Sequence, residues 1–253
     1  MLLQREPAAP LSGHVELLWY YEGRPTGTRT ERVLPNGRFQ IVIDLTAGAG
    51  VVIGLRSRYS TIDAGRFQSM VGVVFRPGGA RLLLAPPADA FFNRAVSLDA
   101  VWGPRTAELV ARLCEARGAA KLCVLEDELR TRLEPRRTLH AAVRHGLITF
   151  DRIPHVERVL EVAKDAGLSR RRFAELFRAQ VGTTPKLYCR LRRFQAVVRE
   201  SAAGTPVEWA RVAAAGGYSD QAHLSREFQE FAGLSPSAWL AASRPSLNHV
   251  VVR

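Results

Sequence analysis

Arginine is the residue in this sequence with the greatest capacity to bind a charged partner. Lys and Arg number 36 against 24 Asp and Glu, which gives a formal net charge of +12. A guanidinium group donates paired hydrogen bonds to a phosphate, to a carboxylate or to the edge of a guanine base. Three arginines are consecutive, at Arg170, Arg171 and Arg172. The charge balance therefore favours an acidic partner such as nucleic acid.

The positive charge alone does not locate a binding face. Residues 1–150 carry 20 basic and 14 acidic side chains, and residues 151–253 carry 16 and 10, so each part has a net charge of +6. The local pattern of side chains has to identify the site.

Residues suited to catalysis or metal binding are few and scattered. Cys114, Cys123 and Cys189 are too few for a four-thiolate zinc site, and no histidine and carboxylate relay accompanies Cys189. His14 is the only histidine in the first hundred residues. The sequence has no Gly-x-Ser-x-Gly motif and no phosphate-loop motif. We therefore expect a protein that binds rather than catalyses, with no catalytic residue, no cofactor and no metal.

The first hundred residues have the pattern of an antiparallel β domain. Phe39, Ile41, Ile43 and Leu45 recur at every second position, the period expected when one face of a strand is buried. Proline and glycine at 35–37 and 77–79 mark turns between apolar runs. We expect strands at residues 14–21, 28–34, 38–45, 51–55, 70–76 and 81–85. They would form a barrel-like or curled sheet, a sensing or interaction domain over residues 1–98.

The period changes from two to three and four residues at about residue 104. Leucines from 109 to 133 then follow the stripe of an amphipathic helix, which predicts two connecting helices within a linker at 99–137. No strand pattern follows residue 137. Thr184-Pro185, Thr205-Pro206 and Ser235-Pro236 each place a capping hydroxyl before a proline, which favours helix starts. We expect helices at 138–149, 155–166, 169–181, 184–200, 206–215, 220–232 and 236–242. The fold class is therefore α+β, with an all-α part at 138–242 and a tail at 243–253.

An internal repeat organises the helical part. Val162-Ala163 and Gly167-Leu168-Ser169 recur fifty residues later as Val212-Ala213 and Gly217-Tyr218-Ser219. After a one-residue insertion, Phe173, Phe177, Gly182, Pro185 and Tyr188 correspond to Leu224, Phe228, Gly233, Pro236 and Trp239. Each unit reads as helix, glycine-containing turn and helix. This pattern predicts two helix-turn-helix units, at about 155–181 and 206–232, joined by one long helix.

The helical part resembles the AraC/XylS-type transcriptional regulators of bacteria. The resemblance covers about 138–242 and rests most on the second unit, from Ala214-Ala215-Gly216-Gly217-Tyr218-Ser219 through Asp220-Gln221-Ala222-His223-Leu224. Gly182-Thr183-Thr184-Pro185-Lys186 and Arg192-Arg193-Phe194-Gln195-Ala196 also look like segments of that family. Leu34-Pro35-Asn36-Gly37 and Phe75-Arg76-Pro77-Gly78-Gly79 are similar, more loosely, to the N-terminal domains of some members. The resemblance implies an effector or partner at the strand domain that alters DNA binding.

Candidate DNA contacts in the first unit follow from helix geometry. A helix in the major groove presents its N-terminal residues to base edges, while its apolar side stays on the domain. Inward positions at 173, 176 and 177 leave Arg170, Arg171, Ala174 and Glu175 on the outer face. Arg172 and Arg178 lie nearer its flanks. Arg171 is the preferred base-contacting residue.

In the second unit the same reasoning selects Gln221, Ala222, His223, Ser225 and Arg226. Gln221 could pair with adenine, and Arg226 with guanine or phosphate. Lys186, Arg190, Arg192 and Arg193 on the long helix would contact phosphates or support the domain.

We therefore expect a cytoplasmic, sequence-specific regulator of transcription. Its main partner is a double-stranded DNA operator; RNA polymerase, a small-molecule effector and a second copy of the chain are further candidates, and a membrane is not. One alternative is a DNA-repair alkyltransferase with a similar DNA-binding half, although the chain has only three cysteines and none in a Pro-Cys-His-Arg setting. Another is an effector-free binder whose strand domain only dimerises.

Overall fold

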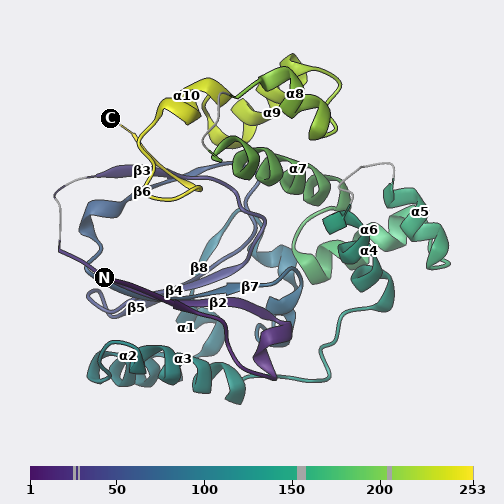
Figure 1. Ribbon diagram of the computed structural model, residues 1–253. Helices are drawn as coiled ribbons and strands as arrows, with labels where there is room; N and C mark the ends of the chain where they lie inside the picture. The colour runs from purple at the N-terminus through teal and green to yellow at the C-terminus, as the bar shows by residue number, and fades with distance from the viewer. Residues whose placement is uncertain (25–26, 28, 153–157, 204–206, 253) are drawn as a thin grey trace.

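The computed structural model describes residues 1–24, 27, 29–152, 158–203 and 207–252 (Figure 1). Antiparallel strands dominate the first hundred residues and helices dominate the rest, so the α+β class is confirmed. Within the described residues, no helix is both long and apolar enough to span a lipid bilayer.

The strands form two antiparallel sheets. Their bounds are β1 (Leu2–Arg5), β2 (Val15–Glu22), β3 (Thr30–Val33), β4 (Gln40–Asp44), β5 (Ala49–Ile53), β6 (Ser60–Asp63), β7 (Ser69–Phe75), β8 (Ala95–Ser97) and β9 (His249–Val251). The larger sheet has the order β1-β2-β7-β4-β5-β8, and the smaller has the order β6-β3-β9. Because β1 and β8 are edges of the larger sheet, its described strands do not close into a barrel.

One face of the larger sheet is covered by helices. The period of two expected along residues 39–45 is present, since Ile41 and Ile43 are fully buried while Gln40, Val42 and Asp44 are half-buried. The buried face packs against the helices that follow β8, so the segment expected to be a linker supplies part of the core of the sheet. In Figure 1 these helices, α1 to α3, lie below the sheet.

Two expectations for the strand region were wrong. Residues 81–85 do not form a strand; Gly79–Leu82 is a short 3-10 helix, and Leu83 and Leu84 continue into the buried core. The tail expected at 243–253 contains strand β9, which pairs antiparallel with β3 of the N-terminal half. Strands β1, β6 and β8 were not expected.

The helices follow the predicted order. Their bounds are α1 (Leu98–Trp102), α2 (Arg105–Glu115), α3 (Ala120–Thr131), α4 (Ala141–Arg152), α5 (Arg158–Asp165), α6 (Arg170–Val181), α7 (Pro185–Ser201), α8 (Trp209–Ala215), α9 (Gln221–Ala232) and α10 (Pro236–Ala241), with 3-10 helices η1 (Leu11–Gly13), η2 (Ala64–Arg66), η3 (Gly79–Leu82) and η4 (Ala88–Phe91). The starts expected near 155 and at Thr205-Pro206 lie outside the described residues.

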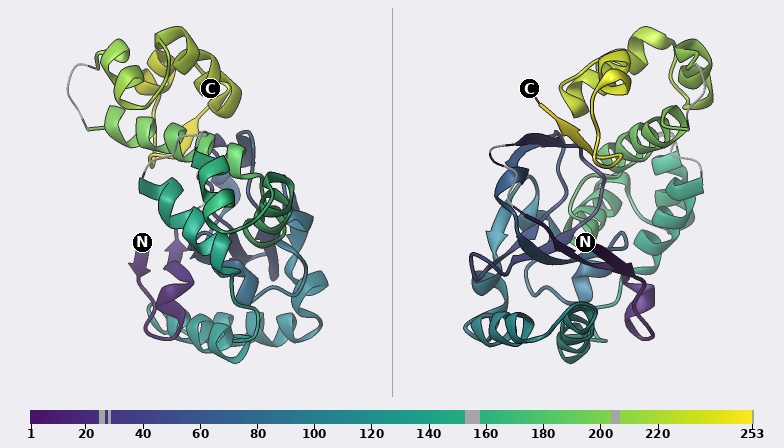
Figure 2. Two further views of the ribbon diagram at one scale, coloured as in Figure 1. Left: turned by 90° about the vertical axis from the view of Figure 1, so that its right-hand side faces the viewer. Right: turned by 60° about the vertical axis from the view of Figure 1, so that its left-hand side comes forward.

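Helix α7 joins two cores. Tyr188 and Cys189 near its beginning are buried with Phe173 and Phe177 of α6. Phe194, further along α7, lies in a second cluster with residues of α8, α9 and α10. Figure 2 shows α8–α10 and α2–α3 at opposite ends of the molecule. The two helix-turn-helix units thus have separate cores but share one continuous helix.

Candidate nucleic-acid interface

The first helix-turn-helix unit exposes the N-terminal end of α6. Ser169 caps this helix, because its Oγ accepts a hydrogen bond from the backbone N–H of Arg172 at 3.2 Å. Phe173 and Phe177 on the opposite side of α6 are fully buried. The guanidinium groups of Arg170, Arg171 and Arg172 are exposed at the capped end of the helix. Uncompensated backbone N–H groups and these arginines together make this end attractive to an anion.

Arg171 lies in an exposed ion pair one turn along the helix. Its Nε donates to Oε1 of Glu175 at 2.9 Å, and Nη1 of Arg172 is 3.7 Å from Oε2 of the same carboxylate. The Arg171 guanidinium holds the pKa of Glu175 below its usual value, and Glu175 raises the pKa of Arg171. The side chain of Arg171 is 90% exposed, so the pair is open to solvent and to a competing anion.

The remaining residues assigned to this surface differ in position. Ala174 is half-buried beside the arginines. Arg178, a further turn along α6, contacts the N-terminal half: its Nη2 lies 3.2 Å from Oδ2 of Asp89 in η4. Arg178 therefore lies at the junction between the two halves of the chain.

The second unit has the same arrangement with an acidic cap. Asp220 caps α9, and its Oδ1 accepts a hydrogen bond from the backbone N–H of His223 at 2.6 Å. This bond is the main reason that the pKa of Asp220 lies below its ordinary value. Gln221, Ala222 and Arg226 are exposed on the outer side.

His223 and Ser225 are only half-exposed. The His223 ring packs edge-on against Tyr218 with 5.2 Å between centroids, and its Nδ1 is 3.2 Å from Oγ of Ser219. The ring is thus held in position at the turn between α8 and α9.

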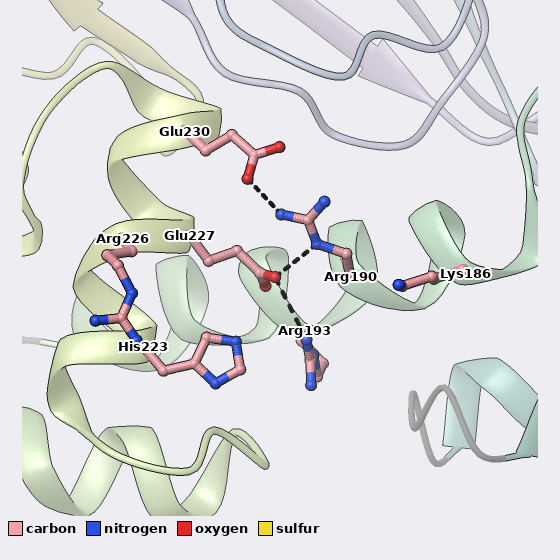
Figure 3. Close-up of a pocket in the computed structure, with 7 residues that line it drawn as sticks. All are labelled: Lys186, Arg190, Arg193, His223, Arg226, Glu227 and Glu230. Carbon is pink, nitrogen blue, oxygen red and sulfur yellow. Dashed lines mark hydrogen bonds and ion pairs between the residues drawn. The ribbon is translucent and has the colours of Figure 1, made fainter.

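A groove with basic walls runs between α7 and α9 (Figure 3). It has a volume of about 430 Å³. Its basic residues are Lys186, Arg190 and Arg193 from α7 and His223 and Arg226 from α9. In Figure 3 the Lys186 and Arg226 side chains lie on opposite sides of the groove, away from the dashed ion pairs.

The groove is held together by one buried carboxylate. Glu227 of α9, 4% exposed, accepts a hydrogen bond from Nε of Arg190 at 2.7 Å and lies 3.4 Å from Nη2 of Arg193. The hydroxyl of Tyr218 donates to its other oxygen at 2.9 Å. Burial, with the Glu227 carboxylate, raises the pKa of Tyr218. Arg190 also pairs with Glu230.

These contacts separate the four cations of α7 that the sequence pattern selected into two groups. Arg190 and Arg193 join α7 to α9, and Arg192 pairs with Asp151 of α4 at 2.9 Å. Lys186 is exposed and has no ion pair within the described residues. Sequence reasoning left both roles open for all four cations.

Glu227 is the residue that sequence reasoning missed. It lies between Arg226, assigned to the outer face, and Phe228, assigned to the core. This position at the boundary of the two faces is the sequence signal that could have identified it. A carboxylate buried at such a boundary requires basic partners, and α7 supplies two. No group of three or more His, Cys, Asp or Glu within the described residues is placed to hold a metal ion.

Two protein-family models match separate parts of the chain. Residues 162–242 match the model of a helix-turn-helix domain, and residues 3–97 match a domain of unknown function, DUF6597. No curated protein matches the sequence.

Solved structures of one protein cover nearly the whole chain. The structure of ToxT from Vibrio cholerae at 1.65 Å resolution is 11% identical, with a TM-score of 0.43 over 95% of this chain and 96% of ToxT. ToxT bound to (E)-4-(8-methylnaphthalen-1-yl)but-3-enoic acid is 10% identical, with a TM-score of 0.45 over 94% of this chain and 96% of ToxT. These low values do not carry a ligand or a function from one protein to the other.

Proposed function

From the AraC-type helix-turn-helix domain in its C-terminal half, we propose that this protein regulates transcription by binding a specific DNA operator with both units. The observation that carries the proposal is the pair of capped helices, α6 and α9, whose N-terminal ends are exposed while their opposite sides are buried. Such helices contact base edges in the major groove. A protein acting on the genome of a bacterium would do so in the cytoplasm.

The length of α7 suits simultaneous binding of two grooves. Its 17 residues span about 25 Å at 1.5 Å per residue. Successive major grooves on one face of DNA are about 34 Å apart, and side chains at the two ends add to the span of the helix. We expect two base determinants centred about 10 base pairs apart.

Each unit contributes a set of contacts to this proposal. In the first unit Arg171 contacts bases, and Arg170, Arg172 and Ala174 adjoin it. In the second unit Gln221 and Arg226 contact bases or phosphate, with Ala222, His223 and Ser225 beside them. Lys186, which lines the groove between α7 and α9, contacts the phosphate backbone and adds affinity without selecting sequence.

Selection of bound sequences from a random pool of duplexes tests the two sets separately. Arg171→Ala should relax the base preference at one determinant and Arg226→Ala at the other, with losses of about tenfold on the selected site. Lys186→Ala should weaken selected and unrelated sequences equally. Arg211→Ala, which removes an exposed arginine from α8, is the matched control and should change neither preference. The assignment fails if Arg171→Ala and Arg226→Ala erase the same preference, or if neither alters one.

Salt dependence tests the electrostatic part of the proposal. With about six phosphate contacts, the logarithm of affinity should fall against the logarithm of salt concentration with a slope of about −5. An affinity that is flat between low and moderate salt would exclude these contacts.

We further propose that the N-terminal half, residues 1–98, binds a small apolar effector on the sheet face opposite α2 and α3. Trp19 lies across Gly72 there: a Cβ added at Gly72 would be 2.4 Å from the indole. Val42 and Val51, paired across β4 and β5, are half-buried on the same face. Half-exposed apolar side chains around an indole are a surface that an apolar ligand can cover.

A thermal-shift screen of small apolar carboxylates and aromatics checks this second proposal. A binding compound should raise the unfolding midpoint of the wild type and have less effect on Trp19→Leu. If the protein dimerises as its concentration is raised and no compound stabilises it, the effector-free dimeric binder is favoured instead. The alkyltransferase alternative has less support, because Cys189 is buried and Cys114 and Cys123 lie in α2 and α3, on the sheet domain.

A further inference from the structure

The N-terminal half contacts both helix-turn-helix units at equivalent positions of the repeat. Gly182 ends α6 and Gly233 ends α9, both with positive φ (96° and 67°), and the two glycines correspond at an offset of 51 in the sequence. An aromatic ring of the N-terminal half lies directly against each one. A Cβ at Gly182 would be 2.7 Å from Cε2 of Phe39, and a Cβ at Gly233 would be 2.3 Å from Cε1 of Tyr59.

The contact with the first unit combines packing and charge. Phe39 is 4% exposed and meets Phe91 edge to face, with 5.9 Å between centroids. Next to this aromatic pair, Asp89 forms its 3.2 Å ion pair with Arg178 of α6. The C-terminal end of α6 is therefore fixed to the N-terminal half by a ring and an ion pair.

The contact with the second unit is made through the backbone. The backbone N–H of Tyr59 donates to the carbonyl of Phe231 at 2.8 Å. Nη1 of Arg32 donates to the carbonyl of Gly233 at 2.7 Å, and its guanidinium stacks 4.6 Å above the Tyr59 ring. Two carbonyls at the end of α9, which a helix leaves without internal partners, thus accept hydrogen bonds from the strand domain.

A single turn connects the two contacts and crosses α7. Leu34 is buried in the core of the second unit, and the carbonyl of Pro35 accepts a hydrogen bond from Nε2 of Gln195 in α7 at 2.9 Å. Asn36 and Gly37 complete the turn, with Oδ1 of Asn36 accepting from the backbone N–H of residue 38 at 3.0 Å. The Leu34-Pro35-Asn36-Gly37 motif is therefore a part of the junction.

Both contacts lie at the C-terminal ends of the recognition helices, away from the residues proposed to contact bases. Each helix has 12 residues, a length of about 18 Å, so the contacts leave the N-terminal ends accessible to DNA. Holding both helices at corresponding points fixes the separation and the relative rotation of their N-terminal ends.

We propose that Arg32, Phe39, Tyr59 and Asp89 form a brace that sets the operator spacing which the two units accept. The inference rests on the proposed function and assigns these residues a positioning role. In the braced protein, one base pair inserted between the determinants moves one of them by about 3.4 Å and rotates it by about 34°, so that both helices cannot bind in register.

The test compares affinities for the selected operator and for the same operator with one base pair inserted. The affinity of the wild type should fall about tenfold or more when the base pair is inserted, because one base contact or more is lost. The brace variant Tyr59→Ala/Arg32→Gln, in the full-length chain, should lose less than about threefold because its second unit can rotate. Tyr21→Ala/Arg56→Gln makes the same two kinds of substitution in the N-terminal half, at residues outside the contacts with α9 described above, and should behave as wild type.

Two further measurements keep the outcomes distinct. If the double variant loses its far-UV circular dichroism, the single variant Arg32→Gln replaces it in the test. The insertion penalty of Arg32→Gln should still be smaller than that of the wild type. Amide hydrogen exchange without DNA should speed up in α8 and α9 of the brace variant and not in the control.

The possible failures of the inference and of the proposed function differ. Equal insertion penalties in wild type and brace variant, or a selected site with one determinant only, would overturn the brace while DNA binding stands. If the wild type selects no sequence, the proposed function fails, and unchanged exchange in α8 and α9 would then also overturn the brace.

Discussion

Replacing Glu227 with glutamine should destabilise the second helix-turn-helix unit more than any other loss of one negative charge on α9. The carboxylate accepts from Arg190 at 2.7 Å and from Tyr218 at 2.9 Å, and it faces Arg193 at 3.4 Å. Removing one partner of a buried ion pair costs about 3–5 kcal/mol, because the other charge stays buried without compensation.

The expected cost of Glu227→Gln lies at or just below the lower end of that range. The amide oxygen can still accept from Tyr218, and Arg190 keeps Glu230 as a partner. Arg193, 9% exposed, is the charge left with the least compensation. We expect a loss of about 2–3 kcal/mol, which lowers the unfolding midpoint by about 5–10 °C in a chain of this size.

Thermal unfolding followed by far-UV circular dichroism and tryptophan fluorescence measures this loss. Trp239 is buried in the same core and reports on the second unit. Glu230→Gln is the matched control: its carboxylate is 42% exposed, so its loss should cost less than about 1 kcal/mol. Equal midpoints for the two variants would refute the reasoning that Glu227 holds α9 on α7.

Three further predictions concern the ends of the recognition helices and the last strand. Glu175→Gln should raise the affinity for DNA, measured by fluorescence anisotropy, because Arg171 no longer leaves an ion pair on binding; an unchanged affinity contradicts this competition. The pKa of Asp220 is lower in the folded protein than in the unfolded chain. Its ionised carboxylate therefore stabilises the fold at pH values above the ordinary Asp pKa, and this stabilisation is lost as the pH falls through the folded-state pKa. Melting midpoints of wild type and Asp220→Asn should therefore converge on acidification, and a gap that widens would contradict the sign. Deleting residues 246–252 should speed amide exchange in α9, because Val250 is buried in the second core; equal exchange would show that β9 adds nothing to that unit.

The helices could be predicted from sequence because their signals are local. Thr184 and Ser235 cap α7 and α10 as their hydroxyl-proline pairs predict, with the hydroxyls accepting from the N–H groups of Leu187 and Ala238 at 3.2 Å. A cap and a helical period both act within a few residues of the chain. These signals are therefore visible without knowledge of the fold.

The strands show where such local reasoning ends. In the segment 81–85, Leu82 to Ala85 form an apolar run without alternation, which a buried 3-10 turn fits as well as a strand does. The β6 segment, Ser60–Asp63, is mostly polar and becomes a strand by pairing with β3. Pairing between distant segments leaves no signal in the local sequence. The differences between the expected and the observed strands could therefore not be anticipated.

The candidate site divides in the same way. Exposure of the first turns of α6 and α9 follows from the periodicity of their own buried residues. The partner of Arg178 is Asp89, and the hydrogen-bond acceptor of Arg32 is Gly233, so neither contact can be read from a neighbouring position. Long-range ion pairs and hydrogen bonds depend on the packing of the two halves.

The pairing of β9 with β3 also has a consequence for the order of synthesis. A ribosome completes β3 and β6 early, but residues 249–251 emerge only after all of the helices. Until then one edge of β3 presents unpaired backbone groups, which is a site for mispairing with another chain. Closing so long a segment of chain is slow relative to local helix formation. The small sheet is therefore completed last. A chaperone that shields nascent strands would have to cover the edge of β3 for longer than the other strands.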